Sequence, residues 1–546
     1  MAPRSATSHR MLFTGARFSA AVARWIHCLG ADSVIVSTER CADFVQGCEP
    51  KHAVPPALLR PVSVHQLREL VQIAAEFSIP IHPVSRGKNW GYGSASASQE
   101  GCVVVDLGAL NRVLEVNADL AYAVIEPGVT QEQLYRYLEE QNIPLMVDVT
   151  GAPPSASIVG NTIERGYGYT PYSDHFAHTA CFEVLLSDGT LFETGFGRFA
   201  NARAKYLHKT GIGPSLDGLF TQSNFGIVTK MAVWLMPKPD RCAAYVVQAQ
   251  NDAELARMLV ALRDLKLRGL VEGSPHVVND LRSLSLLAQF PFDSSSPDTF
   301  GENELSILRK RWGVAPWTCI GGLWGTEGQV AESARAIAER MKSAGLTEPQ
   351  ILSALEVSGD QHDCTLPKTE EELTRYRAEL MSALVSGIPT MRAIPGMYWR
   401  KRQPANRSSL DPIRDKCGLL WCSPVIPLTE ADSNLLMSII RGTCRERRLE
   451  VNVALALVND RTATATVGLF FDPAEPEQRA AVEEAYSTLL RRFAESGYFP
   501  YRGADTLSEL CGAPNQSEIA FQQVCYRIKS ALDPQHIVSP NRYGII

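Results

Sequence analysis

The densest candidate for chemistry is a glycine-rich stretch that runs from Pro83 to Gly93. It reads Pro-Val-Ser-Arg-Gly-Lys-Asn-Trp-Gly-Tyr-Gly. Glycines let successive backbone N–H groups curl around an anion, and Arg86 and Lys88 add positive charge. The stretch lacks the Gly-Lys-Ser/Thr ending of a P-loop and the spacing of a Rossmann fingerprint. From these residues alone, a phosphate-binding loop and an ordinary glycine-rich turn are both open.

Two more segments combine glycine with aromatic or polar residues. Residues 157–161 read Ser-Ile-Val-Gly-Asn, and residues 165–175 read Arg-Gly-Tyr-Gly-Tyr-Thr-Pro-Tyr-Ser-Asp-His. Glycines and tyrosines so close together suggest backbone that approaches a flat, polar ligand. Residues 223–229, Ser-Asn-Phe-Gly-Ile-Val-Thr, form the third segment.

Alternating helices and strands must position these segments between residues 62 and 240. Apolar residues recur at helical spacing over 64–77. Thr130 opens another helix, which runs to about Asn142, and Gln133 has the spacing of a capping box. Short apolar runs and turn residues predict strands at 102–107, 122–125 and 227–234 and a hairpin over 182–194.

A proline pair, Pro237 and Pro239, ends this first region, and the pattern resets from residue 243. Apolar periodicity beyond the boundary predicts helices over 253–266, 330–344 and 474–496 and strands over 419–426 and 463–471. A second structural unit therefore follows the first.

Composition limits the class of protein. The chain has 546 residues, of which 45% are hydrophobic and 21% charged, and a net charge of −6. These are ordinary values for a globular protein. No basic run resembles a nucleic-acid-binding arm, and no apolar stretch reaches the roughly 18 residues that span a bilayer. We expect neither nucleic-acid binding nor a membrane association.

The N-terminus and the cysteines bear on location. The first residues are polar and basic, unlike a secretory signal, and residues 1–31 carry four arginines and no acidic residue. That charge profile is typical of a mitochondrial targeting segment, but 18–29 also reads as the first helix of the fold. The 13 cysteines are an odd number, which favours reduced thiols. We expect an intracellular, cytoplasmic protein, with mitochondrial targeting as the alternative.

Motifs for other chemistries are absent. There is no His-Glu-x-x-His sequence, and His175 and His178 have helical spacing but no third ligand. There is no Gly-x-Ser-x-Gly elbow. We predict no metal site and no serine hydrolase.

Taken together, the three glycine-rich segments resemble the vanillyl-alcohol oxidase / 4-cresol dehydrogenase flavoprotein family. The resemblance covers about residues 60–240 and resumes from Ala531 to Gly544. It implies an α+β fold, in which a two-part FAD-binding domain carries a central α+β cap. The implied domains are 1–240 for FAD binding, 241–499 for the cap, and 500–546 for a C-terminal segment that returns to the FAD-binding domain.

The resemblance also implies which residues bind FAD. They lie in the three glycine-rich segments and near the C-terminus. They are Pro83, Ser85, Arg86, Gly87, Lys88, Asn89, Gly91, Gly93, Pro153, Ser157, Gly160, Asn161, Gly166, Tyr167, Gly168, Gly226, Ile227, Val228 and Arg542.

The family binds a para-substituted phenol as its phenolate. Tyr92, Tyr169, Tyr501 and Arg502 match the family's catalytic positions. Because a phenol has a pKa of about 10, donors and a cation must favour its anion. The implied reaction transfers a hydride from the benzylic carbon to flavin N5 and leaves a quinone methide. Taken singly, each residue also reads as an ordinary core tyrosine or a surface arginine.

Three departures from the family qualify this reading. Leu419 stands where family oxidases carry the histidine that links covalently to FAD, so we expect non-covalent FAD, with Tyr398 as the other candidate for a link. Ala152 takes the place of an aspartate near N5, and Asp148 lies four residues earlier. The cap strand over 461–466 lacks the usual Glu or His, which predicts a more apolar pocket.

These departures leave alternatives open. One is a biosynthetic oxidase or dehydrogenase that uses FAD on a non-phenolic alcohol or amine. Another is a flavin-binding partner subunit whose chemistry has degraded. The expected partners are a small aromatic substrate and either O2 or another electron acceptor, such as a cytochrome. The resemblance adds the expectation of a homodimer.

Overall fold

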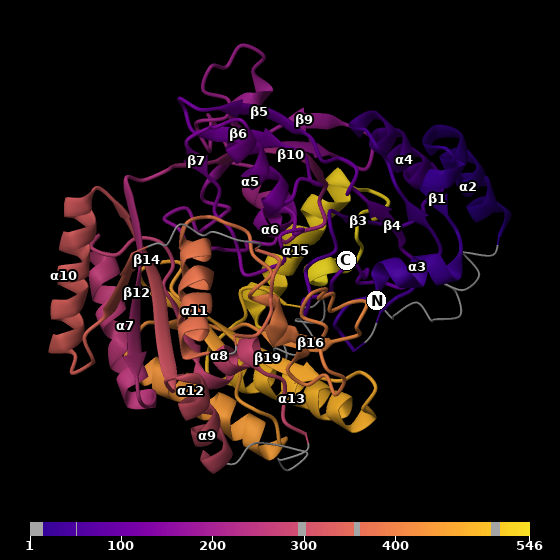
Figure 1. The fold of residues 1–546 in the computed structure, drawn as a ribbon. Coiled ribbons are helices and arrows are strands. Elements are labelled where there is room, and N and C mark those ends of the chain that lie inside the picture. The colour runs from indigo at the N-terminus through magenta and orange to yellow at the C-terminus, as the bar shows by residue number, and fades with distance from the viewer. Residues whose placement is uncertain are drawn as a thin grey trace.

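The computed structural model describes residues 15–50, 52–292, 302–353, 361–367, 369–503 and 514–545. Helices and sheets are mixed along the chain, so the fold is α+β, as predicted (Figure 1). Two sheets and a short two-stranded pairing are built from residues before 238, and a larger sheet is built from residues after 240. Within the described ranges, no helix is long and apolar enough to cross a membrane.

The first sheet has four short strands, of which β2, β3 and β4 run parallel. In the order β1-β2-β4-β3, their bounds are Val34–Ile35, Leu58–Leu59, Val103–Asp106 and Ile81–Val84. Helices α2 (Ala16–Leu29) and α4 (Val64–Glu76) pack on it, while α3 (Thr38–Val45) precedes β2. The strand predicted at 102–107 and the helix predicted at 64–77 are confirmed. A parallel strand buried on both faces reads as an unbroken apolar run.

The second sheet is antiparallel. In the order β5-β6-β10-β8-β9, its strands are Val113–Asn117, Tyr122–Ile125, Ile227–Trp234, Thr179–Leu185 and Leu191–Glu193. The predicted strands at 122–125 and 227–234 and the hairpin are confirmed. The short elements of this region are β7 (Leu145–Met146), β11 (Met236–Pro237), η1 (Ala31–Ser33), η2 (Gly195–Arg198) and η3 (Asp217–Phe220).

Helix α5 (Gln131–Glu140) confirms the helix predicted from Thr130 but not all of its cap. Thr130 Oγ1 accepts the backbone N–H of Gln133 at 3.1 Å. The Gln133 side chain, however, donates to the carbonyl of Asn111 at 2.7 Å instead of reaching back to Thr130. The predicted capping box is therefore only half formed.

The third sheet has eight strands and forms the cap. In the order β15-β12-β14-β13-β18-β19-β16, its strands are Gln350–Ser353, Arg241–Ala249, Trp317–Gly325, His276–Asn279, Val453–Ala456, Thr462–Phe471 and Gly418–Cys422. A further strand, β17 (Val425–Pro427), pairs with β19. The single strand predicted over 419–426 is therefore two strands, separated at Ser423 and Pro424.

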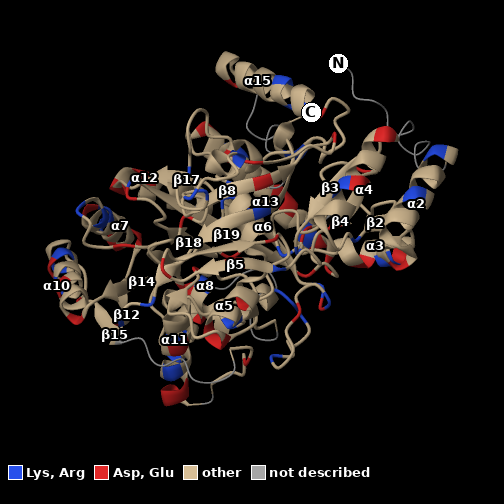
Figure 2. Ribbon diagram, turned by 90° about the horizontal axis from the view of Figure 1, so that it is seen from above, with Lys and Arg blue, Asp and Glu red and all other residues tan. Residues whose placement is uncertain are grey.

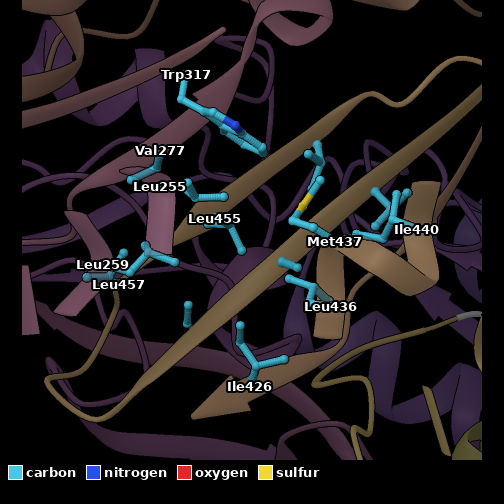
Figure 3. Packing of buried hydrophobic residues seen from close by; sticks show 14 of the residues in the cluster. Leu255, Leu259, Val277, Trp317, Ile426, Leu436, Met437, Ile440, Leu455 and Leu457 are labelled. Carbon is cyan, nitrogen blue, oxygen red and sulfur yellow. The ribbon is translucent and has the colours of Figure 1, made fainter. Parts of the chain in front are cut away.

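Long helices cover one face of the cap sheet and build its core with it. They are α7 (Asp252–Leu267), α10 (Glu327–Ser343), α12 (Glu430–Glu446) and α13 (Pro476–Glu495). Apolar side chains such as Leu255, Trp317, Met437 and Leu455 interdigitate there (Figure 3). Figure 2 shows acidic and basic residues mixed along α7 and α10, and Arg340 pairs with Asp264 between these helices at 2.7 Å.

The remaining cap elements are α8 (Asp280–Leu287), α9 (Glu302–Trp312), α11 (Glu370–Val385) and η4 (Ile394–Tyr398). One apolar cluster joins both regions of the chain. It contains Trp90 from the glycine-rich loop and Leu284, Trp399, Leu419 and Phe470 from the cap. This cluster fixes the cap against the loop that follows β3.

The C-terminal segment returns to the first sheet (Figure 1). After α15 (Gln516–Leu532), Val538 forms a parallel bridge with Ile81 of β3. The N–H of Ile81 donates to Ile537 at 2.7 Å, and the N–H of Ser539 donates back to Ile81 at 2.8 Å. The last short element is η5 (Arg542–Gly544). Residues 537–539 thus extend the edge of the first sheet next to β3.

Candidate functional site

A groove is lined by four stretches of the chain: the loop after β3, helix α6 (Ile158–Ile163), the start of β10 and the C-terminal segment. Most of the predicted cofactor residues line it. They are Pro83, Ser85, Arg86, Gly87, Lys88, Asn89, Ser157, Gly160, Asn161, Gly226, Ile227, Val228 and Arg542. Four segments that are far apart in the sequence therefore meet in one place.

The floor of the groove depends on a close approach between the loop after β3 and α6. A Cβ atom on Gly160 would collide with Ser85 Oγ, so glycine is required there. Ser157 caps α6, since its Oγ accepts the N–H of Gly160 at 2.8 Å and donates to the carbonyl of Pro127 at 2.6 Å. The floor therefore consists of backbone and small polar side chains.

Several polar groups of the groove fit a nucleotide cofactor. The buried atoms Arg502 Nε and Asn224 Oδ1 have no hydrogen-bond partner within the described part of the chain. Unpaired buried groups are costly, and a ligand that carries donors and acceptors would satisfy them. Arg86 donates to the carbonyl of Gly128 at 2.9 Å, and Lys88 Nζ lies 5.3 Å from the ring centre of Trp90. These two cations help to hold the loop in place.

The other predicted cofactor residues lie outside the lining of the groove. They are Gly91, Gly93, Pro153, Gly166, Tyr167 and Gly168. Gly91 accepts a hydrogen bond from the N–H of Trp421 at 3.2 Å. A side chain on Gly168 would collide with Asp148. These glycines shape the surrounding loops, and Tyr167 belongs to an aromatic cluster.

That cluster brings the predicted catalytic residues together. The hydroxyl of Tyr92 is hydrogen-bonded to Ser423, and the guanidinium of Arg502 lies over the Tyr92 ring at 4.4 Å. The rings of Tyr167 and Tyr501 are 5.7 Å apart. Residues from the glycine-rich loop, from the segment after α6 and from the C-terminal side of the cap therefore share one site.

Tyr169, the fourth predicted residue, stands next to this group. Its ring stacks on that of His276 at 4.1 Å, and Tyr167 lies 5.9 Å from the same imidazole. Burial lowers the pKa of His276 to about 4, so this side chain is neutral near pH 7. The stack presents flat apolar surfaces beside the tyrosine hydroxyls.

The ionisation states in the cluster favour an anionic ligand. Burial raises the pKa of Tyr92 well above its usual value, so its hydroxyl stays protonated and can donate. Burial also raises the pKa of Tyr501, although Arg502 and hydrogen bonds with Tyr92 and Tyr167 oppose that rise. The pKa of Arg502 is raised, because Tyr501, Tyr92 and Glu164 outweigh the effect of burial. The site therefore combines protonated tyrosine hydroxyls with the charged guanidinium of Arg502.

Asp148 and Ala152 lie at the two positions that bear on the aspartate of the family. Asp148 accepts the N–H groups of Tyr169 and Thr170 at 3.2 and 2.7 Å and contacts His175 at 2.7 Å. Its carboxylate thus holds the tyrosine-rich loop. Ala152 lines the groove, so a methyl group occupies the position that resembles the family's aspartate.

Both candidates for a covalent link make contacts within the protein. Leu419 is fully buried in the apolar cluster that contains Trp90 and Phe470. The hydroxyl of Tyr398 donates to Asp415 at 2.6 Å and accepts the N–H of Asp411 at 2.8 Å. Tyr398 does not line the groove.

Three neighbours of the site escaped the sequence interpretation. His276 and Ser423 contact the cluster, and the charge of Arg282 interacts with its tyrosines, but all three residues lie outside the glycine-rich segments. A lone arginine, histidine or serine carries no local pattern, so only the folded cap brings these residues to the tyrosines. Glu164, which pairs with Arg542 and Tyr543, escaped for the same reason.

Comparison with known proteins agrees with this geometry. Residues 55–195 match the family described as an FAD binding domain. The chain is 36% identical over 500 residues to 1'-carboxy-chondrochloren decarboxylase of Chondromyces crocatus, which covers 89% of this chain and 90% of the relative.

Two further likenesses cover almost the whole chain. The 4-cresol dehydrogenase [hydroxylating] flavoprotein subunit of Pseudomonas putida is 30% identical over 97% of this chain and 96% of the relative. The structure of p-cresol methylhydroxylase with substrate bound superposes with a TM-score of 0.86 at 28% identity, over 97% of this chain and 98% of that one. FAD is the cofactor that these comparisons and the groove support. The chain is an FAD-dependent oxidoreductase that belongs to the vanillyl-alcohol oxidase / 4-cresol dehydrogenase flavoprotein family.

Proposed function

We propose that this protein oxidises a para-substituted phenol at its benzylic carbon. The observation that carries the proposal is the arrangement of Tyr92, Tyr501 and Arg502, in which Arg502 Nε has no partner among the described residues. An arginine whose donor is unpaired beside two protonated tyrosines suits a phenolate oxygen, because charge-assisted hydrogen bonds are the strong ones. The named relatives support the same substrate class, since one acts on 4-cresol.

The chain's own residues would prepare the substrate for oxidation. Arg502 and the hydroxyls of Tyr92 and Tyr501 would lower the pKa of the bound phenol and stabilise its anion. The stack of Tyr169 on His276 would orient the aromatic ring. Bound FAD would supply the acceptor for the hydride that leaves the benzylic carbon. The substrate would then be a quinone methide.

The fate of that quinone methide depends on which groups surround it. Addition of water is helped by a general base. Asp148, four residues before Ala152, is held by His175 and two backbone N–H groups, and Ala152 offers only a methyl group. This arrangement favours loss of a group from the side chain over addition of water.

A decarboxylating oxidation is the second candidate, and the relative at 36% identity, which is named as a decarboxylase, favours it. The substrate would carry a carboxylate on the carbon next to the benzylic one. After the hydride has left, the bond to the carboxylate breaks and CO2 departs. The electron pair of that bond becomes the new C=C bond of the side chain, and the ring regains its phenolate. One FAD would be reduced for each CO2 released.

A comparison of two matched ligands tests the proposed function. Under anaerobic conditions, 4-ethylphenol should bleach the visible absorbance of the bound flavin. 4-Ethylanisole has the same side chain but no ionisable hydroxyl, so it should leave the flavin oxidised. If neither compound nor other para-alkylphenols bleach the flavin, while a simple alcohol or amine does, the phenol assignment is wrong. A flavin that no reductant of these classes reduces would favour a degraded partner subunit.

We also propose that FAD is held without a covalent bond. Leucine has no nucleophilic atom, and the hydroxyl of Tyr398 is engaged by Asp415. Precipitation of the purified protein with acid should therefore release the yellow colour into the supernatant. Colour that stays in the pellet would show a covalent link, and peptide mapping would then identify the linked residue.

The electron acceptor and the oligomeric state of the protein can also be measured. O2 or another acceptor would reoxidise the flavin, and the rate of O2 consumption against the rate of dye reduction separates the two. A homodimer is proposed from the family resemblance, and sedimentation of the purified protein measures it.

A further inference from the structure

Arg282 is a cation of the cap whose charge interacts with the tyrosine cluster. It lies in the first turn of α8, where its backbone N–H donates to the capping side chain of Asn279 at 3.1 Å. Asn279 also donates to the carbonyl of Val451 at 2.6 Å, which fixes the start of α8 against the chain before β18. The guanidinium stacks on the indole of Trp421 at 4.7 Å. The position of Arg282 is therefore set by the fold.

The surroundings of Arg282 are aromatic rather than acidic. The groups that act on its charge are the hydroxyls of Tyr169, Tyr167 and Tyr92. Within the described residues, no Asp or Glu pairs with its guanidinium. Its one side-chain hydrogen bond goes to Asn452 Oδ1, at a long 3.5 Å. Burial lowers the pKa of Arg282, and the hydroxyls of Tyr169, Tyr167 and Tyr92 partly oppose that change.

An unpaired amide donor lies beside this arginine. Asn452 is 2% exposed, and its Nδ2 has no partner within the described residues. Asn452 Nδ2 lacks an acceptor within the described residues, and the guanidinium has only one long hydrogen bond there, so both donors are costly in a partly apolar site. A carboxylate satisfies both, because its two oxygens accept only, and planar bidentate contact with arginine is its strongest mode of binding.

We propose that Arg282 binds a carboxylate on the side chain of the substrate, so that the substrate is an acid that carries a para-hydroxyphenyl group. The inference rests on the proposed function, in which Arg502 holds the phenolate end. Arg502 then binds the phenolate oxygen, and Arg282 binds the carboxylate. Arg282 is thus a residue that determines specificity.

Binding of two unreactive ligands tests this role without turnover. 4-Hydroxycinnamate and its methyl ester differ only in the charge of the acid, and neither has an sp3 benzylic hydrogen. In the flavin-loaded protein, Arg282→Met should weaken binding of the acid by about 10- to 100-fold, measured by calorimetry. Binding of the ester should change little. Arg282→Lys keeps the positive charge but not the planar guanidinium, so its affinity for the acid should lie between those of wild type and Arg282→Met.

Asn452→Asp provides a test that keeps Arg282 in place. The new carboxylate is nearly isosteric with the amide and would neutralise Arg282, so binding of the acid should weaken while binding of the ester is retained. This variant decides the question if Arg282→Met does not fold.

Three outcomes would overturn the proposal. Equal weakening of acid and ester would show that Arg282 acts only through its stack on Trp421. Binding of the ester with exclusion of the acid would show that the site rejects the charge, although the phenol assignment would survive. If neither ligand binds and 4-ethylphenol does not bleach the flavin, the proposed function fails and this inference fails with it.

Discussion

Replacement of Arg502 by methionine is expected to lower kcat/KM for a para-alkylphenol by about 100- to 1,000-fold. The reason is that a fixed charge which stabilises an oxyanion is worth that much when it is removed from a preorganised site. Arg502 is 9% exposed, lies over the ring of Tyr92 and has a donor atom without a partner in the described structure. Steady-state kinetics with 4-ethylphenol measures the loss.

The pH dependence distinguishes loss of charge from loss of structure. In the variant, the phenol must ionise without help, so its activity should rise as the pH approaches the phenol pKa of about 10. The gap between wild type and variant should narrow over the same range. Tyr501→Phe, which removes one donor, should cost about 10- to 100-fold. A loss that is equal at every pH, or that accompanies a loss of flavin, would contradict a role in phenolate binding.

Replacement of Lys529 by methionine is expected to destabilise the protein by about 3–5 kcal/mol. Lys529 and Asp533 form an ion pair at 2.7 Å, and both side chains are fully buried. Removal of one partner leaves an uncompensated buried charge, which carries a cost of this size. Lys529 Nζ also donates to the carbonyls of Asn224 at 2.6 Å and Val538 at 2.8 Å. It therefore ties α15 to the groove and to the added edge of the first sheet.

Unfolding monitored by flavin fluorescence should show this effect directly. Release of the flavin should begin at a clearly lower temperature in Lys529→Met than in wild type. Arg491→Met is a matched control, since Arg491 pairs with Glu495 at 3.0 Å on the surface, where ion pairs contribute less than about 1 kcal/mol. If both variants shift the transition equally, the buried pair does not hold the C-terminal segment.

Local sequence patterns were sufficient to predict the helices and strands around the flavin groove. The strand at 227–234 and the hairpin at 182–194 could be predicted because alternation and turn residues are local signals. The break between β16 and β17 could not, because residues 419–426 are continuously apolar except at Ser423 and Pro424. The break matters for the site: the carbonyl of Ser423 accepts the N–H of Tyr501 at 3.1 Å, and its hydroxyl meets Tyr92.

The residues of the candidate site also form two groups: those that could be predicted from the sequence and those that could not. Tyr92, Tyr501 and Arg502 could be named from a family resemblance, because each sits in a recognisable motif. Arg282 and His276 could not, because they reach the tyrosines only after the cap sheet forms. Residues that meet only across the contact between two domains form no local sequence motif.

In the proposed reaction, the benzylic carbon of a bound phenolate is the atom that loses the hydride. The most direct measurement is the anaerobic rate of flavin bleaching by 4-ethylphenol that carries deuterium only at the benzylic carbon. If cleavage of that C–H bond reduces the flavin, the deuterated substrate should react several-fold more slowly than the protiated one, and the effect should persist in Arg502→Met. Equal rates for the two isotopologues, with cleavage of some other bond in the product, would contradict it.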